Sequence, residues 1–114
     1  MTSTLQHFQM RMNGTLQAKN FYEYVFGWTV ERVAPGSNLY NIKQGSEIIG
    51  ELVRPPATRP SAIIPFYKVA SKSAAVSTAV DAHGVPEDPA ISVSIKSIYA
   101  VIDDASQCTF GVFQ

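Results

Sequence analysis

Two glycines that each end a helical pattern, Gly27 and Gly84, stand half the length of the 114-residue chain apart. Spacing of this kind indicates a tandem duplication of one small unit. The helical apolar positions are Ala18, Phe21, Tyr22 and Val25 before the first glycine, and Ala75, Val76, Ala79, Val80 and His83 before the second. We expect one helix from Thr15, as its N-cap, to Gly27, and another over Ser71–His83, which Gly84 ends. Neither half buries enough surface to fold alone, so the two halves must pack together or swap with a second chain.

Strand patterns surround each predicted helix. Residues 5–12 alternate, with Phe8, Met10 and Met12 on one face and His7, Gln9 and Arg11 on the other. Further strands are expected at 28–33, 38–43, 47–54, 63–69, 91–93, 98–103 and 108–113. The sequence therefore predicts a single domain over 1–114, with a βαβββ module at about 5–54, a Pro-rich connector at 55–61 and a second module at about 62–114.

Charge and composition limit the partners. Nine basic residues balance nine acidic ones, which removes the electrostatic reason to expect nucleic acid or an anionic membrane surface as partner. Cys108 is the only cysteine, and we expect it on the core face with Phe110 rather than as a reactive thiol. The chain lacks a signal-like start and a membrane-length apolar run, so a cytoplasmic protein with a small-molecule partner is expected.

The repeat and its motifs resemble the vicinal oxygen chelate superfamily, the group of glyoxalase I, bleomycin-resistance protein and extradiol dioxygenases. The motifs are HFQMRM at 7–12, FYEYVFGW at 21–28 and AHG at 82–84, each in its place in a repeat. This resemblance implies an α+β fold, in which tandem βαβββ modules form a curved eight-stranded mixed sheet around a cup, with two helices on the outer faces.

Metal-using members of this superfamily take one ligand each from the first, fourth, fifth and eighth strands. The resemblance places His7, Glu51, Pro65 and Gly111 at these four positions. Proline and glycine offer no ligating side chain, and catalytic divalent ions are usually held by three protein ligands. No cofactor is therefore expected, and a divalent metal on the partial set His7 and Glu51 is the alternative.

Alternation along the strands predicts which side chains face the cup. The first module offers a polar wall, and the second an apolar and aromatic one, as in many small-molecule sites. The predicted ligand-binding residues are His7, Gln9, Arg11, Ile49, Glu51, Pro65, Tyr67, Gly111 and Phe113. Gly111, which has no side chain, would enlarge the cup. Several of the residues have a structural interpretation as well: Glu51 and Arg11 form an ion pair, His7 is a satisfied histidine, or Tyr67 and Phe113 fill the cup and leave no cavity.

The leading hypothesis is a metal-free protein that holds a small aromatic or amphipathic molecule in the cup. One alternative is a metal-dependent, glyoxalase-like lyase or a dioxygenase whose ligand set is completed by a partner chain. A further alternative is a structural or protein-interaction module without a cavity. By analogy with superfamily members of this length, we expect a homodimer.

Overall fold

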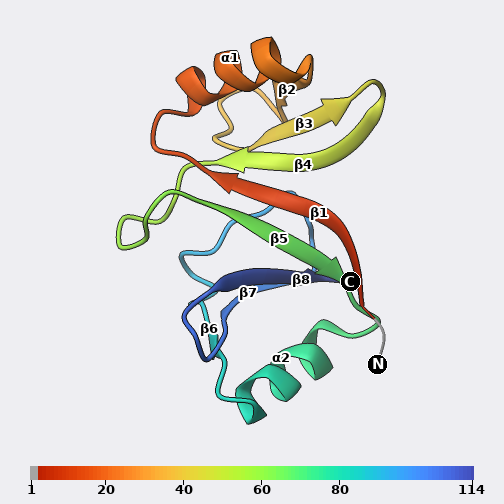
Figure 1. Ribbon diagram of the computed structural model, residues 1–114, viewed down its shortest axis with the longest axis vertical. Helices are drawn as coiled ribbons and strands as arrows, with labels where there is room; N and C mark the ends of the chain where they lie inside the picture. Colours follow the sequence, from red (N-terminus) through yellow and green to blue (C-terminus); the bar gives the residue numbers. More distant parts are fainter. Residues whose placement is uncertain (1–2) are drawn as a thin grey trace.

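The two repeated units join into one continuous mixed sheet (Figure 1). The computed structural model describes residues 3–114, and within them two helices accompany eight strands in the order β2-β3-β4-β1-β5-β8-β7-β6. The elements are β1 (Thr4–Arg11), α1 (Thr15–Phe26), β2 (Thr29–Arg32), β3 (Tyr40–Gln44), β4 (Glu47–Val53), β5 (Ala62–Lys68), α2 (Lys72–Asp81), β6 (Val85–Pro86), β7 (Tyr99–Asp103) and β8 (Thr109–Phe113). The predicted α+β class with a curved eight-stranded sheet is confirmed.

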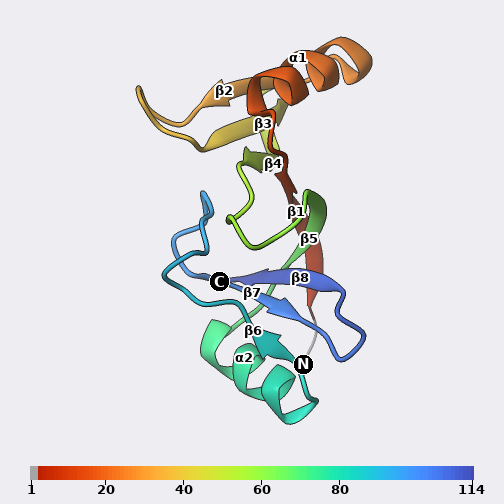
Figure 2. The ribbon, with the colours of Figure 1, turned by 90° about the vertical axis from the view of Figure 1, so that its left-hand side faces the viewer.

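The strand pairing repeats in the two halves. β1 lies parallel to β4, β5 lies parallel to β8, and β1 and β5 pair antiparallel at the centre of the sheet. The two helices lie at opposite ends of the molecule, and the segment 87–98, in light blue, passes behind β1 and β5 in Figure 1 and to their left in Figure 2. We call the face of the sheet that this segment covers the inner face, and the face that carries the helices the outer face.

The outer face holds one apolar core under each helix. Under α1 the buried residues are Met10, Val30, Tyr40, Ile42 and Leu52, and under α2 they are Val69, Ile102 and Val112. Ala18 and Tyr22 of α1 pack on the first core, whereas Phe21 and Val25, predicted on the same helical face, are 58% and 49% exposed. The apolar stripe of α1 is therefore wider than the strip of sheet that the helix covers.

The helix ends differ in part from the sequence prediction. Gly27 ends α1 in the left-handed conformation, at φ 69°, as its position predicts. Thr15 is the first helical residue and Gly14 is the N-cap, without a capping side chain. α2 ends early, at Asp81, and His83 rather than Gly84 adopts the left-handed conformation, also at φ 69°. Gly84 is instead needed for space, because a Cβ there would lie 2.9 Å from the carbonyl oxygen of Ala79.

The strand predicted at 91–93 is absent from the described residues, and β6 is a two-residue strand at Val85–Pro86 that pairs with β7. Pro86 and Pro89 limit how far this strand can extend, because proline has no N–H to donate to a sheet. The chain leaves the sheet after Pro86 and crosses the inner face before it returns at Tyr99. Neither described helix is long and apolar enough to cross a membrane.

Candidate functional site

Four polar side chains on the inner face are almost completely removed from solvent. His7, Gln9 and Arg11 come from β1 and Glu51 comes from β4, and their exposed fractions are 3%, 0%, 1% and 0%. Gln9 and Glu51 are paired neighbours in the parallel β1–β4 ladder, so their side chains emerge side by side. Burial of such groups is costly unless each has hydrogen-bond partners, and the partners define what this part of the molecule can do.

Glu51 is the centre of this group. Its carboxylate accepts four hydrogen bonds: from His7 Nε2 at 2.6 Å, Gln9 Nε2 at 3.1 Å, the Ser94 hydroxyl at 2.7 Å and the Ile95 backbone N–H at 3.0 Å. His7 donates here in the tautomer that carries its proton on Nε2. Two of the four donors come from the segment 87–98, so Glu51 ties that segment to the central strands.

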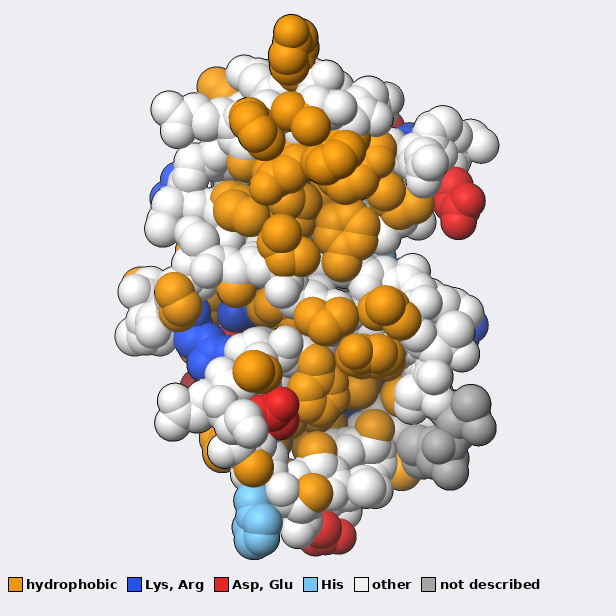
Figure 3. All heavy atoms as spheres, viewed as in Figure 1, with side chains coloured by type: hydrophobic (Ala, Val, Ile, Leu, Met, Phe, Trp, Pro, Cys, Tyr) orange, Lys and Arg blue, Asp and Glu red, His pale blue; other side chains and the backbone are white. Residues whose placement is uncertain are grey.

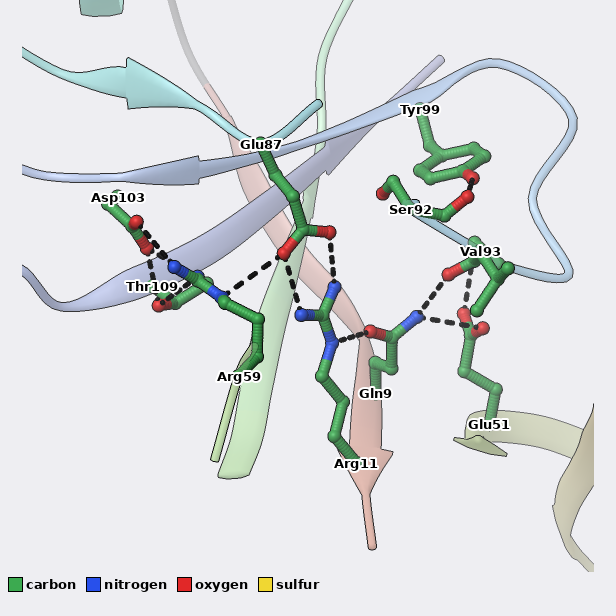
Figure 4. Close-up of polar contacts among 11 residues, drawn as sticks. Gln9, Arg11, Glu51, Arg59, Glu87, Ser92, Val93, Tyr99, Asp103 and Thr109 are labelled. Atoms are coloured by element: carbon green, nitrogen blue, oxygen red, sulfur yellow. Dashed lines mark hydrogen bonds and ion pairs between the residues drawn. The ribbon is translucent and has the colours of Figure 1, made fainter. Parts of the chain in front are cut away.

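Arg11 is neutralised by Glu87 and not by Glu51, which corrects the sequence expectation of an Arg11–Glu51 ion pair (Figure 4). Its two terminal nitrogens donate to the two oxygens of Glu87, each at 2.8 Å, and its Nε donates to Gln9 Oε1 at 2.6 Å. Gln9 in turn donates to the carbonyl oxygen of Val93 at 2.7 Å. A paired fork of this kind is the strongest geometry that arginine offers to a carboxylate.

A second arginine extends the network toward the surface. Arg59, from the Pro-rich connector, donates to Asp103 at 2.7 and 2.8 Å, and its Nε lies 3.3 Å from Glu87. Thr109 also donates to Asp103. Burial by itself raises the pKa of Glu87. The hydrogen bonds and the charge of Arg11, together with the charge of Arg59, lower it by more, so the pKa of Glu87 lies below its ordinary value. The hydrogen bonds from Arg59 hold the pKa of Asp103 below its ordinary value as well.

The fifth strand presents other residues to the inner face than the sequence predicted. His7 pairs with Phe66, and Gln9 pairs with Ile64, so Phe66 and Ile64 share the face of the polar group. Pro65 and Tyr67, predicted to line the cup, point to the outer face, where Tyr67 contacts Phe110. Pro65 pairs with Phe8, a residue of the outer face, so the predicted alternation of β5 is wrong by one residue.

The eighth strand has the predicted alternation but not the predicted space. Gly111 pairs with Phe66, and a Cβ on Gly111 would lie 2.4 Å from the Phe66 ring. The glycine therefore makes room for the ring and does not enlarge the cup. Phe113 is 5% exposed and meets His7 edge to face at 6.1 Å. Cys108, just before the strand, is exposed and not in the core.

These residues do not make a metal site. The positions facing one another across the four strands hold His7, Glu51, Phe66 and Gly111, so two of the four have no donor atom. The two donors that are present bind each other at 2.6 Å. No group of three or more His, Cys, Asp or Glu side chains in residues 3–114 is placed to hold a metal ion. The donor set thus does not fit the three-ligand pattern of catalytic divalent ions.

An open pocket lies beside the filled inner face, in the fork where β1 and β4 separate. The β1–β4 ladder begins only at Phe8 and Gly50, and the preceding residues of the two strands diverge. The pocket in this fork, which we call the fork pocket, has a volume of about 910 Å³. It is lined by Leu5, Gln6, His7, Phe8, Gln44, Glu47, Ile48, Ile49, Ile63, Pro65, Lys96 and Phe113.

The fork pocket gathers four of the nine predicted ligand-binding residues, namely His7, Ile49, Pro65 and Phe113. Gln9, Arg11 and Glu51 lie in the enclosed network instead, Gly111 lies under the Phe66 ring, and Tyr67 lies on the outer face. Ile49 also packs against the core under α1.

Sequence reasoning missed Glu87, Ser94, Ile95 and Lys96, because the segment that carries them has no periodic pattern. One signal was available. An arginine predicted to face an enclosed cup requires a buried carboxylate partner, and Glu87 is one of nine acidic residues that could have been tested for it.

The β1–β8 arrangement, with paired βαβββ units around one inner face, is the fold of vicinal oxygen chelate proteins, and solved structures with this fold resemble the chain. No family model and no curated protein matches the sequence. A hypothetical protein, BH1468 from Bacillus halodurans, superposes with a TM-score of 0.63 at 12% identity, over 99% of this chain and 94% of that one.

Two enzymes share the fold as well. Methylmalonyl-CoA epimerase of Streptomyces coelicolor superposes with a TM-score of 0.61 at 11% identity, over 97% of this chain and 96% of that one. Homoprotocatechuate 2,3-dioxygenase of Brevibacterium fuscum gives 0.62 at 12% identity, over 96% of this chain but only 35% of the dioxygenase. At these identities the likeness shows a common fold and carries no activity over.

Proposed function

We propose that this chain is a member of the vicinal oxygen chelate superfamily that binds a small amphipathic molecule in the fork pocket, without a metal ion. The observation that carries the proposal is the contrast between a filled inner face and an open pocket beside it, whose lining combines apolar side chains with polar ones such as His7 and Lys96. A pocket of about 910 Å³ lies within the usual range for small-molecule sites, which are mostly apolar with a few polar groups.

The fork pocket is a better site than the cup that the sequence predicted. A ligand in the cup would have to displace the segment 87–98, which donates Ser94 and Ile95 to Glu51 and accepts from Gln9. Each buried group left without its partner costs about 1–3 kcal/mol. A ligand in the fork pocket contacts Ile48, which is 44% exposed, and Ile63, which is 59% exposed, without breaking any of these bonds.

The metal-free state is supported by the donor set. His7 and Glu51 satisfy one another, and the facing positions are Phe66 and Gly111. Elemental analysis of protein purified without an affinity tag, before and after incubation with nickel, zinc, manganese or iron(II) salts, tests this part. We expect well under one equivalent of any metal. One equivalent that is lost in Glu51→Gln would overturn it and restore the metal-dependent enzyme as the leading function.

Ligand binding is tested by thermal shift against a library of small aromatic and aliphatic molecules, followed by NMR titration of the hits. We expect stabilising hits whose chemical shift changes map to Ile48, Ile49 and Phe113. A substitution that fills the fork, Ile49→Trp, removes these hits, while Ile91→Trp, at a residue outside the pocket lining that is 42% exposed, leaves them unchanged. A screen without any hit at the fork pocket would instead favour a structural or interaction module.

We also propose that the chain forms a homodimer through its outer face. Phe21 and Phe26 of α1 are 58% and 56% exposed, and neither lines the fork pocket. Figure 3 shows apolar side chains gathered across this face between the two helices. Exposed apolar surface on this scale is typical of interfaces. Sedimentation analysis should give a dimer that Phe21→Glu converts to a monomer; a wild-type monomer at high micromolar concentration would refute the proposal.

A further inference from the structure

We propose that the fork pocket selects a small amphipathic monocarboxylate, whose acid group is held by Lys96 and whose apolar body lies against the isoleucines of the fork. This inference rests on the proposed function, since it names the class of ligand for the same pocket. It depends on one cation whose position is fixed and whose charge no carboxylate in residues 3–114 neutralises.

Lys96 is the only basic residue of the pocket lining besides His7. Its Nζ lies over the Phe113 ring, 4.4 Å from the centroid, and it forms no ion pair with an acidic residue in the described part of the chain. The face of an aromatic ring attracts a cation but does not cancel its charge. An anion that enters the fork would find an ammonium group ready to donate.

The backbone that leads to Lys96 is held in place by hydrogen bonds. The Lys96 backbone N–H donates to Ser94 Oγ at 3.0 Å, and the neighbouring Ile95 N–H donates to Glu51 at 3.0 Å. Ser94 Oγ itself donates to Glu51. The buried carboxylate thus fixes the segment from which the lysine reaches the pocket, so little conformational freedom remains to be lost in this stretch of backbone when a ligand binds.

The remaining charge of the pocket does not oppose this assignment. Glu47 is the one acidic residue in the lining, and it is exposed at the first position of β4, where water and salt screen it. A cationic ligand would be repelled by Lys96, and a neutral one would cover the ammonium group without offering it an acceptor. A carboxylate supplies that acceptor, as a charge-assisted hydrogen bond.

The apolar part of the ligand follows from the rest of the lining. Leu5, Ile48 and Ile63 are 60%, 44% and 59% exposed, and Phe8, Ile49 and Pro65 lie among them. Covering these side chains is favourable in proportion to the apolar area removed from water. One acid group with an aromatic or short aliphatic body therefore matches the lining, whereas a polyanion or a sugar does not.

The test compares 4-phenylbutyrate with its neutral analogue 4-phenylbutanamide, by NMR titration and calorimetry on the full chain. We expect the wild-type protein to bind the acid about tenfold more tightly than the amide, which is the effect of one charge-assisted hydrogen bond of modest strength. Lys96→Met should abolish this preference, and Lys96→Arg should retain it. Arg54→Met, which removes one positive charge from an exposed residue outside the pocket lining, is the matched control and should change nothing.

Equal affinity for the acid and the amide in the wild type, or an acid preference that survives in Lys96→Met, would overturn the inference while the proposed function stands. Failure of both compounds to shift Ile48, Ile49 or Phe113, together with an empty library screen, would overturn the proposed function itself. An acid preference lost equally in Arg54→Met would mean that net charge, and not the position of Lys96, is responsible, and this also refutes the inference.

Discussion

Two substitutions of Glu51 should show how much of the free energy of unfolding depends on the hydrogen bonds of this side chain and how much on its charge. In Glu51→Gln the side chain keeps its size, and its carbonyl oxygen can stay with the two donors that have no alternative. These are the Ile95 backbone N–H, at 3.0 Å, and Gln9 Nε2, which is fixed because Gln9 also binds Arg11 and Val93.

The new amide NH₂ then faces His7 Nε2 and Ser94 Oγ, in place of the oxygen that they contact at 2.6 and 2.7 Å. Both groups can reverse their roles, because histidine has a second tautomer and a hydroxyl both donates and accepts. All four contacts survive as neutral hydrogen bonds, so we expect Glu51→Gln to lower the free energy of unfolding by only about 1–2 kcal/mol.

Glu51→Ala leaves the four donors without this acceptor, and each buried donor left unsatisfied costs about 1–3 kcal/mol, so we expect a loss of about 4 kcal/mol or more. That is a large part of the roughly 5–15 kcal/mol that stabilises a domain. Urea unfolding followed by Trp28 fluorescence and circular dichroism measures both variants. The reasoning is refuted if the alanine variant is as stable as the glutamine variant, or if the glutamine variant loses as much as the alanine variant should.

Three further predictions concern stability. Gly111→Ala should lower the free energy of unfolding by about 2–3 kcal/mol, because the new Cβ would lie 2.4 Å from the Phe66 ring, and Phe66→Leu in the same chain should restore part of the loss; equal stability of Gly111→Ala and wild type in urea would contradict this. Stability should fall at acid pH: the pKa values of Glu87 and Asp103 are lowered in the folded chain, so their contribution is present above the ordinary values of 4.5 and 3.8 and is lost as pH falls through the lowered values. A flat unfolding free energy from pH 6 to pH 3 would disprove it. His83→Gly should raise the free energy of unfolding by up to about 1 kcal/mol, and with it the melting temperature, because φ 69° is strained for histidine and relaxed for glycine. A lower melting temperature would mean that the imidazole has a structural partner.

The fold could be predicted because it depends on patterns that repeat. The alternation of β1, the two helix-ending glycines and the proline connector each report local preferences, and these agree with one another along both halves. The details that failed are those that tertiary contacts decide. Phe21 has a helical spacing that places it with Tyr22, yet the sheet under α1 is too narrow to cover both.

The site could be predicted best on the strands of the first module. His7, Gln9, Arg11 and Glu51 share the inner face because side-chain alternation and the β1–β4 ladder leave no other choice. On β5, Pro65 pairs with Phe8 and so lies on the outer face; the prediction was wrong by one residue, and a shift of one residue reverses every side chain of a strand. The partners from residues 87–98 could not be predicted, because an irregular segment is placed by what it contacts and not by its own pattern.

The filled inner face and the fork pocket are parts of one arrangement. A buried carboxylate with four donors is satisfied in one geometry only, and two of those donors, Ser94 and Ile95, lie directly before Lys96. The network therefore fills the space that an open cup would occupy. It also fixes the segment that carries Lys96, the one lysine or arginine among the described residues of the pocket lining. If the network were merely a way to neutralise leftover polar residues, a better-packed apolar inner face would serve as well. Its connection to Lys96 gives the buried polar group a second consequence: it holds the pocket in the form that a ligand would meet.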